Sequence, residues 1–223
     1  MTEKSSKKIK IILLGDAGVG KSAIFRRFIY NQFQENTYMS TIGADFEIKT
    51  IKYKKQNYRV GLFDTAGEER FRSITKSYYQ MANACFIIFD LSNENSLKGI
   101  NFWIDSIKET SENIKFIILW NKNDLKNKIS DDIIDNELEK FKDIIFMRVS
   151  AAENYNIKNA IERLLDLIEN DIENESTQNS LNKNNTINKK MNLEKKKSNG
   201  ACCWKMWGFS IFIKIKKCIY KYV

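Results

Sequence analysis

The chain has 223 residues, a net charge of +9, and neither histidine nor proline. The absence of histidine excludes His-based catalysis and His metal ligands. The positive charge is concentrated near the C-terminus: residues 173–223 hold eleven lysines and three glutamates, whereas residues 1–172 hold 26 basic and 25 acidic residues and show no sign of nucleic-acid binding.

The cysteines and the polar N-terminus indicate the cellular compartment of the protein. The cysteines, at positions 85, 202, 203 and 218, show no metal-site spacing, and residues 1–10 are too polar for a signal peptide. Cys85 lies in an apolar run and is expected to be a small buried hydrophobic residue. We therefore expect a reducing, cytoplasmic environment.

Strands and helices are predicted to alternate along the chain. Residues 1–8 are expected to be loose, and 54–57 to form a hairpin turn. Apolar and β-branched runs predict strands at 9–14, 46–53, 58–63, 84–91, 114–120 and 144–149. Helical periodicity predicts helices at 22–30, 95–110, 131–141 and 154–170, and a further helical stretch through Tyr79. Ser130 is expected to cap the helix at 131–141.

This alternation predicts an α/β domain with a mostly parallel sheet, here of six strands flanked by about five helices. In such sheets the ligand binds at the carboxyl ends of the strands. The polar motifs each begin where a predicted strand ends, so we expect them to meet at one edge. They lie at residues 15–22, 64–67, 121–124 and 150–151.

Residues 15–22, Gly-Asp-Ala-Gly-Val-Gly-Lys-Ser, match the pattern G-x-x-x-x-G-K-[ST] between a predicted strand and a predicted helix. In that setting backbone N–H groups and a helix N-terminus surround a phosphate. Lys21 is expected to reach the β- and γ-phosphates, and the Ser22 hydroxyl to ligate Mg²⁺. A chance match in a glycine turn is the alternative, and the flanking strand and helix argue against it.

Two further strand ends complete the predicted nucleotide site. Asp64 is placed to hold Mg²⁺ through water, and Gly67 lets a backbone N–H approach the γ-phosphate. In Asn121-Lys122-x-Asp124, the Asp124 carboxylate can accept two hydrogen bonds from guanine, whereas adenine presents an acceptor in the same place. The sequence therefore predicts a guanine nucleotide, and an ATP-dependent P-loop enzyme is disfavoured.

Together the motifs, over residues 9–172, resemble a small Ras-superfamily GTPase with a P-loop NTPase G domain, and within it the Rab family. Residues 40–46, 70–75 and 77–79 are similar to Rab sequences, closest to the secretory branch. The resemblance implies GTP or GDP and Mg²⁺ as cofactors. It also implies a switch in which GTP ties Thr41 and Gly67 to the γ-phosphate and hydrolysis releases both segments.

The resemblance also assigns roles to single residues. Thr41 joins Ser22 and Asp64 as a metal ligand, Phe33 packs against guanine, and Lys21, Gly67 and position 68 act in catalysis. The implied effector surface comprises Ile42, Phe46, Phe63 and Tyr78. The implied nucleotide contacts are Asp16, Ala17, Gly18, Val19, Gly20, Lys21, Ser22, Ala23, Phe33, Thr41, Gly67, Asn121, Lys122, Asp124, Ser150, Ala151 and Ala152.

Several positions depart from the family pattern. Glu68 stands where the family has the glutamine that orients the attacking water, and Ala17 stands where Rabs commonly have serine. We expect slow intrinsic hydrolysis, unless Glu69 or a glutamine of an activating protein positions the water. A hydrolysis-impaired GTP-binding scaffold is the alternative function. Phe63 and Ala152 replace a tryptophan and a lysine of the family.

The tail is predicted to be separate from the GTPase domain. After an N-terminal extension (1–8) and the domain (9–172), residues 173–201 read as a disordered basic linker, and Cys202 and Cys203 as prenylation sites. Twenty residues follow this pair. Either the mature product stops after Cys203, or residues 204–223 form an interfacial membrane anchor, or they form an unlipidated soluble tail.

These features predict a Rab-like GTPase that hydrolyses GTP slowly and recruits effectors during vesicle traffic. We expect a monomer in the cytoplasm and on the cytoplasmic face of secretory endomembranes. The expected partners are effectors, an exchange factor, a GTPase-activating protein, a prenyl-carrier protein and the membrane surface, without nucleic acid.

Overall fold

The computed structural model describes residues 6–35, 41, 44–65, 79, 82–110, 114–126, 129–141 and 144–173. All of them belong to Met1–Glu173, the first of two units into which the chain divides, the second being Asn174–Val223. No helix within the described ranges is long and apolar enough to cross a bilayer. The predicted linker begins at residue 173, which instead lies in a helix; the rest of the linker and the cysteine pair lie outside these residues and stay predictions.

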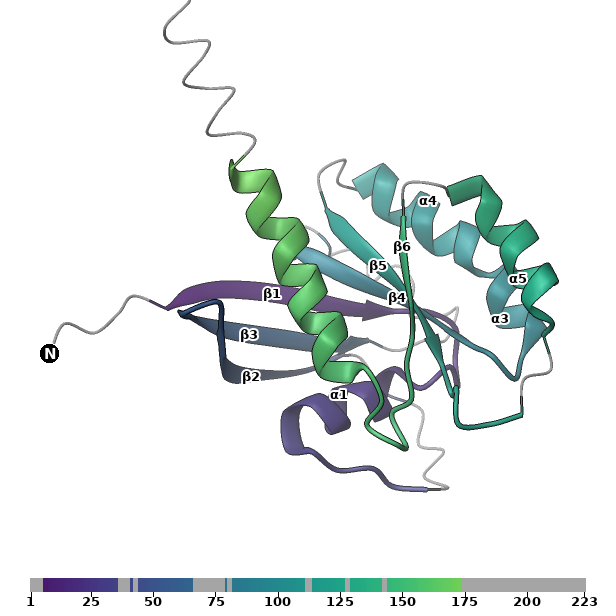
Figure 1. Ribbon diagram of the computed structural model, residues 1–223, viewed down its shortest axis with the longest axis horizontal. Helices are drawn as coiled ribbons and strands as arrows, with labels where there is room; N and C mark the ends of the chain where they lie inside the picture. The colour runs from purple at the N-terminus through teal and green to yellow at the C-terminus, as the bar shows by residue number, and fades with distance from the viewer. Residues whose placement is uncertain are drawn as a thin grey trace, which may run out of the picture. The chain divides into compact units, whose positions relative to one another are not determined.

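A single sheet of six strands runs through the described part, in the order β2-β3-β1-β4-β5-β6 (Figure 1). Within it β2 is antiparallel to β3, and the other neighbouring strands are parallel, as the alternation of elements predicted. The strands are β1 (Lys7–Leu14), β2 (Ala44–Tyr53), β3 (Gln56–Thr65), β4 (Ala84–Asp90), β5 (Lys115–Asn121) and β6 (Ile145–Arg148).

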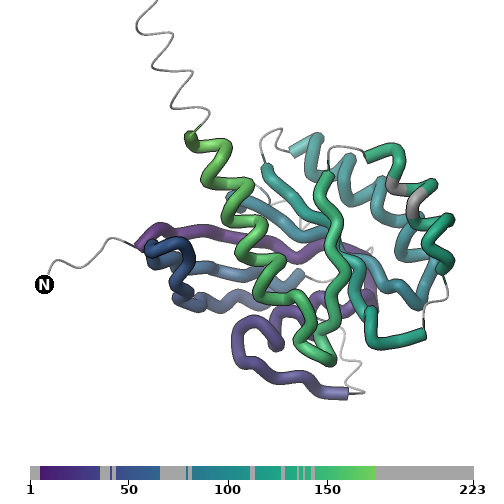
Figure 2. Tube along the Cα trace, in the orientation of Figure 1, coloured from purple at the N-terminus to yellow at the C-terminus, as the bar shows by residue number. Residues whose placement is uncertain are grey.

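Helices cover both faces of the sheet. One face carries α1 and a helix over residues 157–173, and the other carries α3, α4 and α5 (Figures 1 and 2). The named helices are α1 (Lys21–Tyr30), α3 (Glu94–Lys98), α4 (Ile100–Thr110) and α5 (Asp131–Leu138), the last continued by a 3₁₀ turn, Glu139–Phe141.

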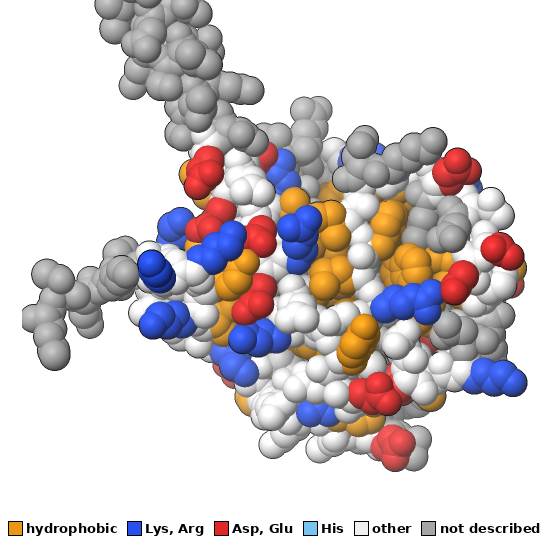
Figure 3. All heavy atoms as spheres, in the orientation of Figure 1, with side chains coloured by type: hydrophobic (Ala, Val, Ile, Leu, Met, Phe, Trp, Pro, Cys, Tyr) orange, Lys and Arg blue, Asp and Glu red, His pale blue; other side chains and the backbone are white. Residues whose placement is uncertain are grey.

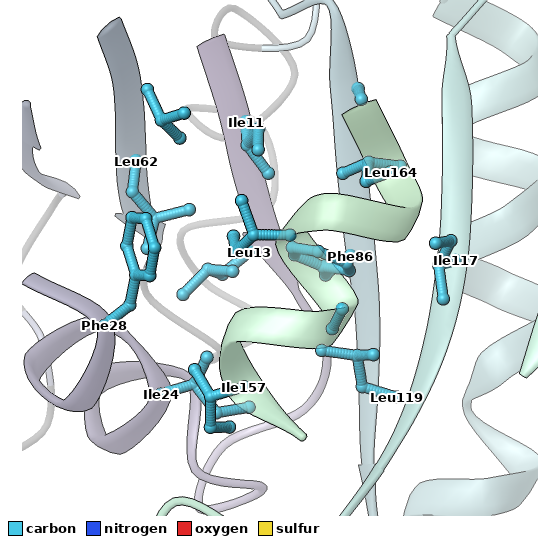
Figure 4. Packing of buried hydrophobic residues seen from close by; sticks show 14 of the residues in the cluster. Ile11, Leu13, Ile24, Phe28, Leu62, Phe86, Ile117, Leu119, Ile157 and Leu164 are labelled. Carbon is cyan, nitrogen blue, oxygen red and sulfur yellow. The ribbon is translucent and has the colours of Figure 1, made fainter. Parts of the chain in front are cut away.

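Because side chains alternate along a strand, the sheet separates two apolar cores. In β1, Ile11 and Leu13 face α1 and the final helix, whereas Ile12 and Leu14 face α3, α4 and α5. Strands covered on both faces are apolar throughout, which explains the uninterrupted apolar runs in the sequence. Figure 4 shows the first core, with labelled side chains Ile11, Leu13, Ile24, Phe28, Leu62, Phe86, Ile117, Leu119, Ile157 and Leu164.

The single helix predicted over 95–110 is wrong: α3 and α4 meet there at Gly99. A Cβ atom on Gly99 would lie 2.5 Å from Oδ2 of Asp16, so a residue with a side chain would displace that carboxylate. At the start of α3, the Asn93 side chain accepts a hydrogen bond from the Asn95 N–H at 3.1 Å. The boundary between α3 and α4 thus lies at the residue that contacts Asp16, and the backbone there keeps helical angles, with φ −68° and ψ −15°.

Two other boundaries also differ from the prediction. β1 begins at Lys7, inside the stretch predicted to be loose, because Lys7 is already paired with Tyr58 of β3. The final helix begins at residue 157 instead of 154, since Asn154 and Asn156 have φ angles of 58° and 57°, which interrupt a helix. It continues at least to residue 173, the last described residue, three residues beyond the predicted end.

The hairpin between β2 and β3 has a shorter turn than predicted. Lys54 and Lys55 alone form it, with φ angles of 44° and 68°. Positive φ at both central residues is the geometry of tight hairpin turns whose twist matches that of the strands. Glycine and asparagine usually signal such turns, so two lysines gave no signal of its exact length.

A polar contact region joins this hairpin to the final helix. Tyr53 donates a hydrogen bond to Asp166 at 2.9 Å, and Tyr58, which is 1 % exposed, donates to Glu169. Lys7 forms an ion pair with Glu169 at 3.1 Å. On this face charges of both signs lie side by side, whereas apolar side chains reach the surface along β6 (Figure 3).

We predict that Tyr58→Phe lowers the free energy of unfolding by about 1–2 kcal/mol, because it removes a hydrogen bond to a carboxylate. That hydrogen bond, with the nearby lysine, holds the pKa of Glu169 below its ordinary value of 4.5. A lowered carboxyl pKa contributes stability above the ordinary value and loses it as the pH falls through the folded-state value. Denaturant unfolding should thus show a difference from wild type at pH 7 that shrinks on acidification. The exposed Tyr155→Phe should show no difference, and equal losses in both variants would contradict the assignment.

Candidate functional site

The predicted motifs meet at the carboxyl edge of the sheet, where Asn121 joins them. Its side chain is 1 % exposed and donates to the Val19 carbonyl at 2.9 Å, in the loop after β1. It also accepts the Ala151 N–H at 3.3 Å, in the loop after β6. Three segments that are far apart in the sequence thus share one carboxamide.

The loop after β1 has the shape that a phosphate requires. Gly15, Gly18 and Gly20 have φ angles of 141°, 78° and 99°, which side-chain-bearing residues rarely adopt. A Cβ atom on Gly20 would also lie 2.2 Å from Nδ2 of Asn121. Gly20 precedes α1 and no side chain caps this helix, so the N–H groups of its first turn stay available to an anion.

Lys21 is the buried cation of this loop. It is 6 % exposed, and Nζ donates to the carbonyls of Gly15 at 2.9 Å and Asp16 at 2.7 Å. Burial lowers the pKa of Lys21 to about 8, although Asp64 and Asp16 act in the opposite direction. A charged ammonium held at the centre of a glycine-rich loop is suited to bind phosphate oxygens.

Three oxygen-bearing side chains lie together beside this loop. Ser22 Oγ is 3.0 Å from Thr41 Oγ1. Asp64 is 3 % exposed, burial raises its pKa although the Ser22 hydroxyl acts in the opposite direction, and its Oδ1 has no hydrogen-bond partner among the described residues. A buried carboxylate oxygen without a partner fits a hard cation such as Mg²⁺, which takes oxygen ligands and keeps several waters.

No group of three His, Cys, Asp or Glu side chains capable of holding a metal occurs in the described part of the chain. The hydroxyls of Ser22 and Thr41 and the carboxylate of Asp64 would hold Mg²⁺, which would supply positive charge beside the phosphates of a bound nucleotide.

The predicted base-binding residues occupy the neighbouring loops. Asp124 is exposed, and its carboxylate accepts a hydrogen bond from the Ser150 hydroxyl. Ser150 in turn accepts the Glu153 N–H at 3.0 Å, so its orientation is fixed from both sides. A carboxylate that is oriented but exposed can receive the two donors of a guanine ring.

Asp90, at the end of β4, was not predicted as a site residue. It is 5 % exposed and pairs with Lys122 at 2.7 Å, while the backbone and hydroxyl of Ser92 donate to its other oxygen at 2.8 and 2.6 Å. Lys122 has a φ angle of 64°, a conformation uncommon for lysine. The predicted strand extends to residue 91, so the strand-end rule that located Asp64 and Asn121 did not select Asp90, which is the last residue of β4.

Arg27 of α1 is a second residue that the sequence did not signal. Its guanidinium donates to the carbonyls of Ala151 and Ala152 at 2.8 Å each, and to the carbonyl of Asn31 at 3.1 Å. It also lies 6.0 Å from the ring centre of Phe33, which is 38 % exposed. One side chain thus connects the last base-binding loop to the segment that carries the predicted guanine-stacking aromatic.

The remaining predicted residues are placed as follows. Ala17 and Gly18 are exposed in the phosphate loop, Val19 is buried in the first core, and Ala23 is half-buried in α1. Phe46 and Phe63 lie opposite each other on β2 and β3. The predicted residues outside the described part of the chain are Ile42, Gly67, Glu68, Tyr78, Cys202 and Cys203.

We predict that Arg27→Met accelerates GDP dissociation by about tenfold, because two carbonyls of the base-binding loop lose charged hydrogen bonds. Arg27→Lys should be intermediate, since a lysine retains the charge but cannot donate to three carbonyls in fixed directions. Stopped-flow release of a fluorescent GDP measures both rates. The exposed Arg59→Met serves as the control, and an unchanged rate in Arg27→Met would refute the role of this side chain.

A family model adds independent information on the chain. The model described as the Ras family matches residues 10–170, which is more than half of the chain and includes β2 to β6 and most of β1. Members of this family are small GTPases that bind guanine nucleotides, typically with Mg²⁺, and the site described above fits both ligands. The chain therefore belongs to the Ras family of small GTPases and is a guanine-nucleotide switch.

Proposed function

We propose that this small GTPase is a Rab-like switch that regulates vesicle-mediated membrane traffic by recruiting effectors in its GTP state. The sequence stretches at 40–46 and 70–79 support a Rab assignment over other branches of the family. The observation that supports effector recruitment is an apolar surface on β2 and β3.

This surface is formed by aromatic and aliphatic side chains near the edge of the sheet. Phe46 is 40 % exposed, and its ring centre lies 4.3 Å from that of Phe63. A Cβ atom on Gly61 would come within 2.7 Å of the Phe46 ring, so the ring lies directly over that glycine. Ile48 extends the surface and is 45 % exposed. Grouped exposed apolar side chains are typical of protein interaction sites.

Phe63 itself is only 8 % exposed. Of these two rings, Phe46 therefore provides most of the apolar area that a partner can reach, and the buried Phe63 ring packs against it. A tryptophan at position 63, as the family commonly has, would present a larger surface. We propose that effectors of this protein have correspondingly different contacts at this point.

Attachment to secretory endomembranes through Cys202 and Cys203 is part of the proposal. The excess of lysines after residue 173 favours an anionic membrane surface, at about 1 kcal/mol for each lysine near the bilayer. Regulation by an exchange factor, a GTPase-activating protein and a prenyl-carrier protein, and action as a monomer, follow from the same resemblance.

The localisation of three tagged proteins tests this attachment: the full-length chain, a chain cut after Cys203, and the cut chain with Cys202→Ser and Cys203→Ser. We expect the cut chain on secretory endomembranes and its serine variant in the cytosol, because two lipid groups are needed for stable anchoring. Equal distribution of the two cut chains would contradict lipidation of the pair. Absence of both the full-length chain and the unsubstituted cut chain from these membranes would contradict the role in traffic.

We further propose that hydrolysis is slow because of Glu68. An ionised carboxylate cannot donate a hydrogen bond, and it adds negative charge beside the transferred phosphoryl group. The positions of Lys21, Ser22, Thr41 and Asp64 around the phosphate loop support residual turnover. These residues favour a slow enzyme over the second candidate, a scaffold that binds GTP without hydrolysing it, which Glu68 and Ala17 would favour.

Glu68→Gln is predicted to accelerate single-turnover GTP hydrolysis by on the order of 10- to 100-fold, the effect of one well-placed transition-state donor. Release of phosphate from the preloaded protein measures the rate. Glu69→Gln is the matched control and should change the rate little. An equal or slower rate for Glu68→Gln would refute the proposal, and acceleration by Glu69→Gln alone would assign the role to that neighbour. No turnover in either variant or in wild type would favour the scaffold.

A further inference from the structure

The carboxylate of Asp16 in the phosphate loop is held by α4. The indole N–H of Trp103 donates to Asp16 Oδ1 at 2.9 Å. Gly99, four residues before Trp103, leaves room for the carboxylate. A Cβ atom at this position would lie 2.5 Å from Asp16 Oδ2 and 3.2 Å from Oδ1. The carboxylate thus lies between the indole N–H of Trp103, which donates to it, and Gly99, which has no side chain to displace it.

Two parts of Asp16 therefore have separate partners. Its backbone carbonyl accepts Lys21 Nζ at 2.7 Å inside the loop, whereas its side-chain oxygens contact α4. A carboxylate in a phosphate-binding loop presents an electrostatic problem, because it repels the polyanion that the loop binds. Holding the carboxylate in a fixed position keeps it from turning toward the phosphates.

Trp103 is well suited to this task. It is 2 % exposed and belongs to the second core, together with Ile100 and Ile104 of the same helix. A buried indole in a packed helix has little freedom to move, so its N–H has a fixed direction. Gly99 and Trp103 are four residues apart, so in helical geometry they lie on one side and contact the same carboxylate.

We propose that Trp103 and Gly99 are positioning residues for nucleotide binding, which fix the Asp16 carboxylate so that the phosphate loop can accept the phosphates of GTP and GDP. They act through Asp16 and touch no ligand themselves. The inference rests on guanine-nucleotide binding by the domain and is independent of the proposed role in membrane traffic.

The test is a double-mutant cycle on the full-length chain with Trp103→Phe and Asp16→Asn. Dissociation of GDP and of a non-hydrolysable GTP analogue is measured in constant excess Mg²⁺. Trp103→Phe retains the aromatic ring but removes the donor, so the released carboxylate should accelerate dissociation of the GTP analogue by about tenfold. On the Asp16→Asn background the same change should have less than about a twofold effect, because a neutral amide does not repel phosphate.

Gly99→Ala provides an independent route to the same result, since its Cβ atom displaces the carboxylate while Trp103 remains. It should also accelerate dissociation, and again mainly where Asp16 is present. If the thermal transition shows that Trp103→Phe does not fold, the Gly99→Ala variants with and without Asp16→Asn test the inference by themselves. Equal acceleration with and without the Asp16 carboxylate, or none, overturns the inference.

Trp120→Phe is the matched control. The indole N–H of Trp120 has no hydrogen-bond partner, so its loss should change dissociation by less than about twofold. Acceleration equal to that of Trp103→Phe would attribute the effect to loss of indole volume and would also overturn the inference. Nucleotide retention by wild type is measured in the same assay, and none of the arms reports on membrane attachment.

Discussion

The carboxamide of Asn121 is the contact on which the ligand site depends. It uses its donor on the phosphate loop and its acceptor on the last base-binding loop, and it is itself part of the strand that carries the guanine motif. The fit is close, since a Cβ atom on Gly20 would collide with the same amide. Because the amide is buried, loss of either partner would leave a polar group unsatisfied, so the two loops are fixed relative to each other.

The charges at the site explain why the protein requires its ligands. Lys21 and Asp64 are both nearly fully buried, and burial disfavours the charged form of each, lowering one pKa and raising the other. A bound polyanion and a divalent cation would supply the missing partners, the phosphates for the ammonium and the cation for the orphaned carboxylate oxygen. The same buried charges that cost stability thus favour binding of nucleotide and metal together.

Features that depend on residues close together in the sequence could be predicted, and features that depend on distant residues could not. The parallel sheet, and the arrival of Lys21, Asp64 and Asn121 at one edge, depend on strand patterns and short motifs, and these were predicted. The boundary at Gly99, which faces Asp16, and the hydrogen bonds from Arg27 to the loop at 151–152 depend on long-range contacts. The contacting segments are about 80 to 125 residues apart, and no local pattern encodes such contacts. Glu68 and the cysteine pair lie outside the described residues, so their roles are still predictions.

The two halves of the nucleotide site are held from opposite faces of the sheet. Arg27, on α1, fixes the base side, whereas Trp103, on α4, fixes the phosphate side. Asn121 links the two loops at the edge of the sheet. Because α1 begins at Lys21 of the phosphate loop, a change in this helix can reach both halves of the site, whereas the Trp103 indole acts on the Asp16 carboxylate from the other face. The proposed role of Glu68 in hydrolysis concerns a third part of the sequence, and a substitution there would leave the contacts of Arg27 and Trp103 intact.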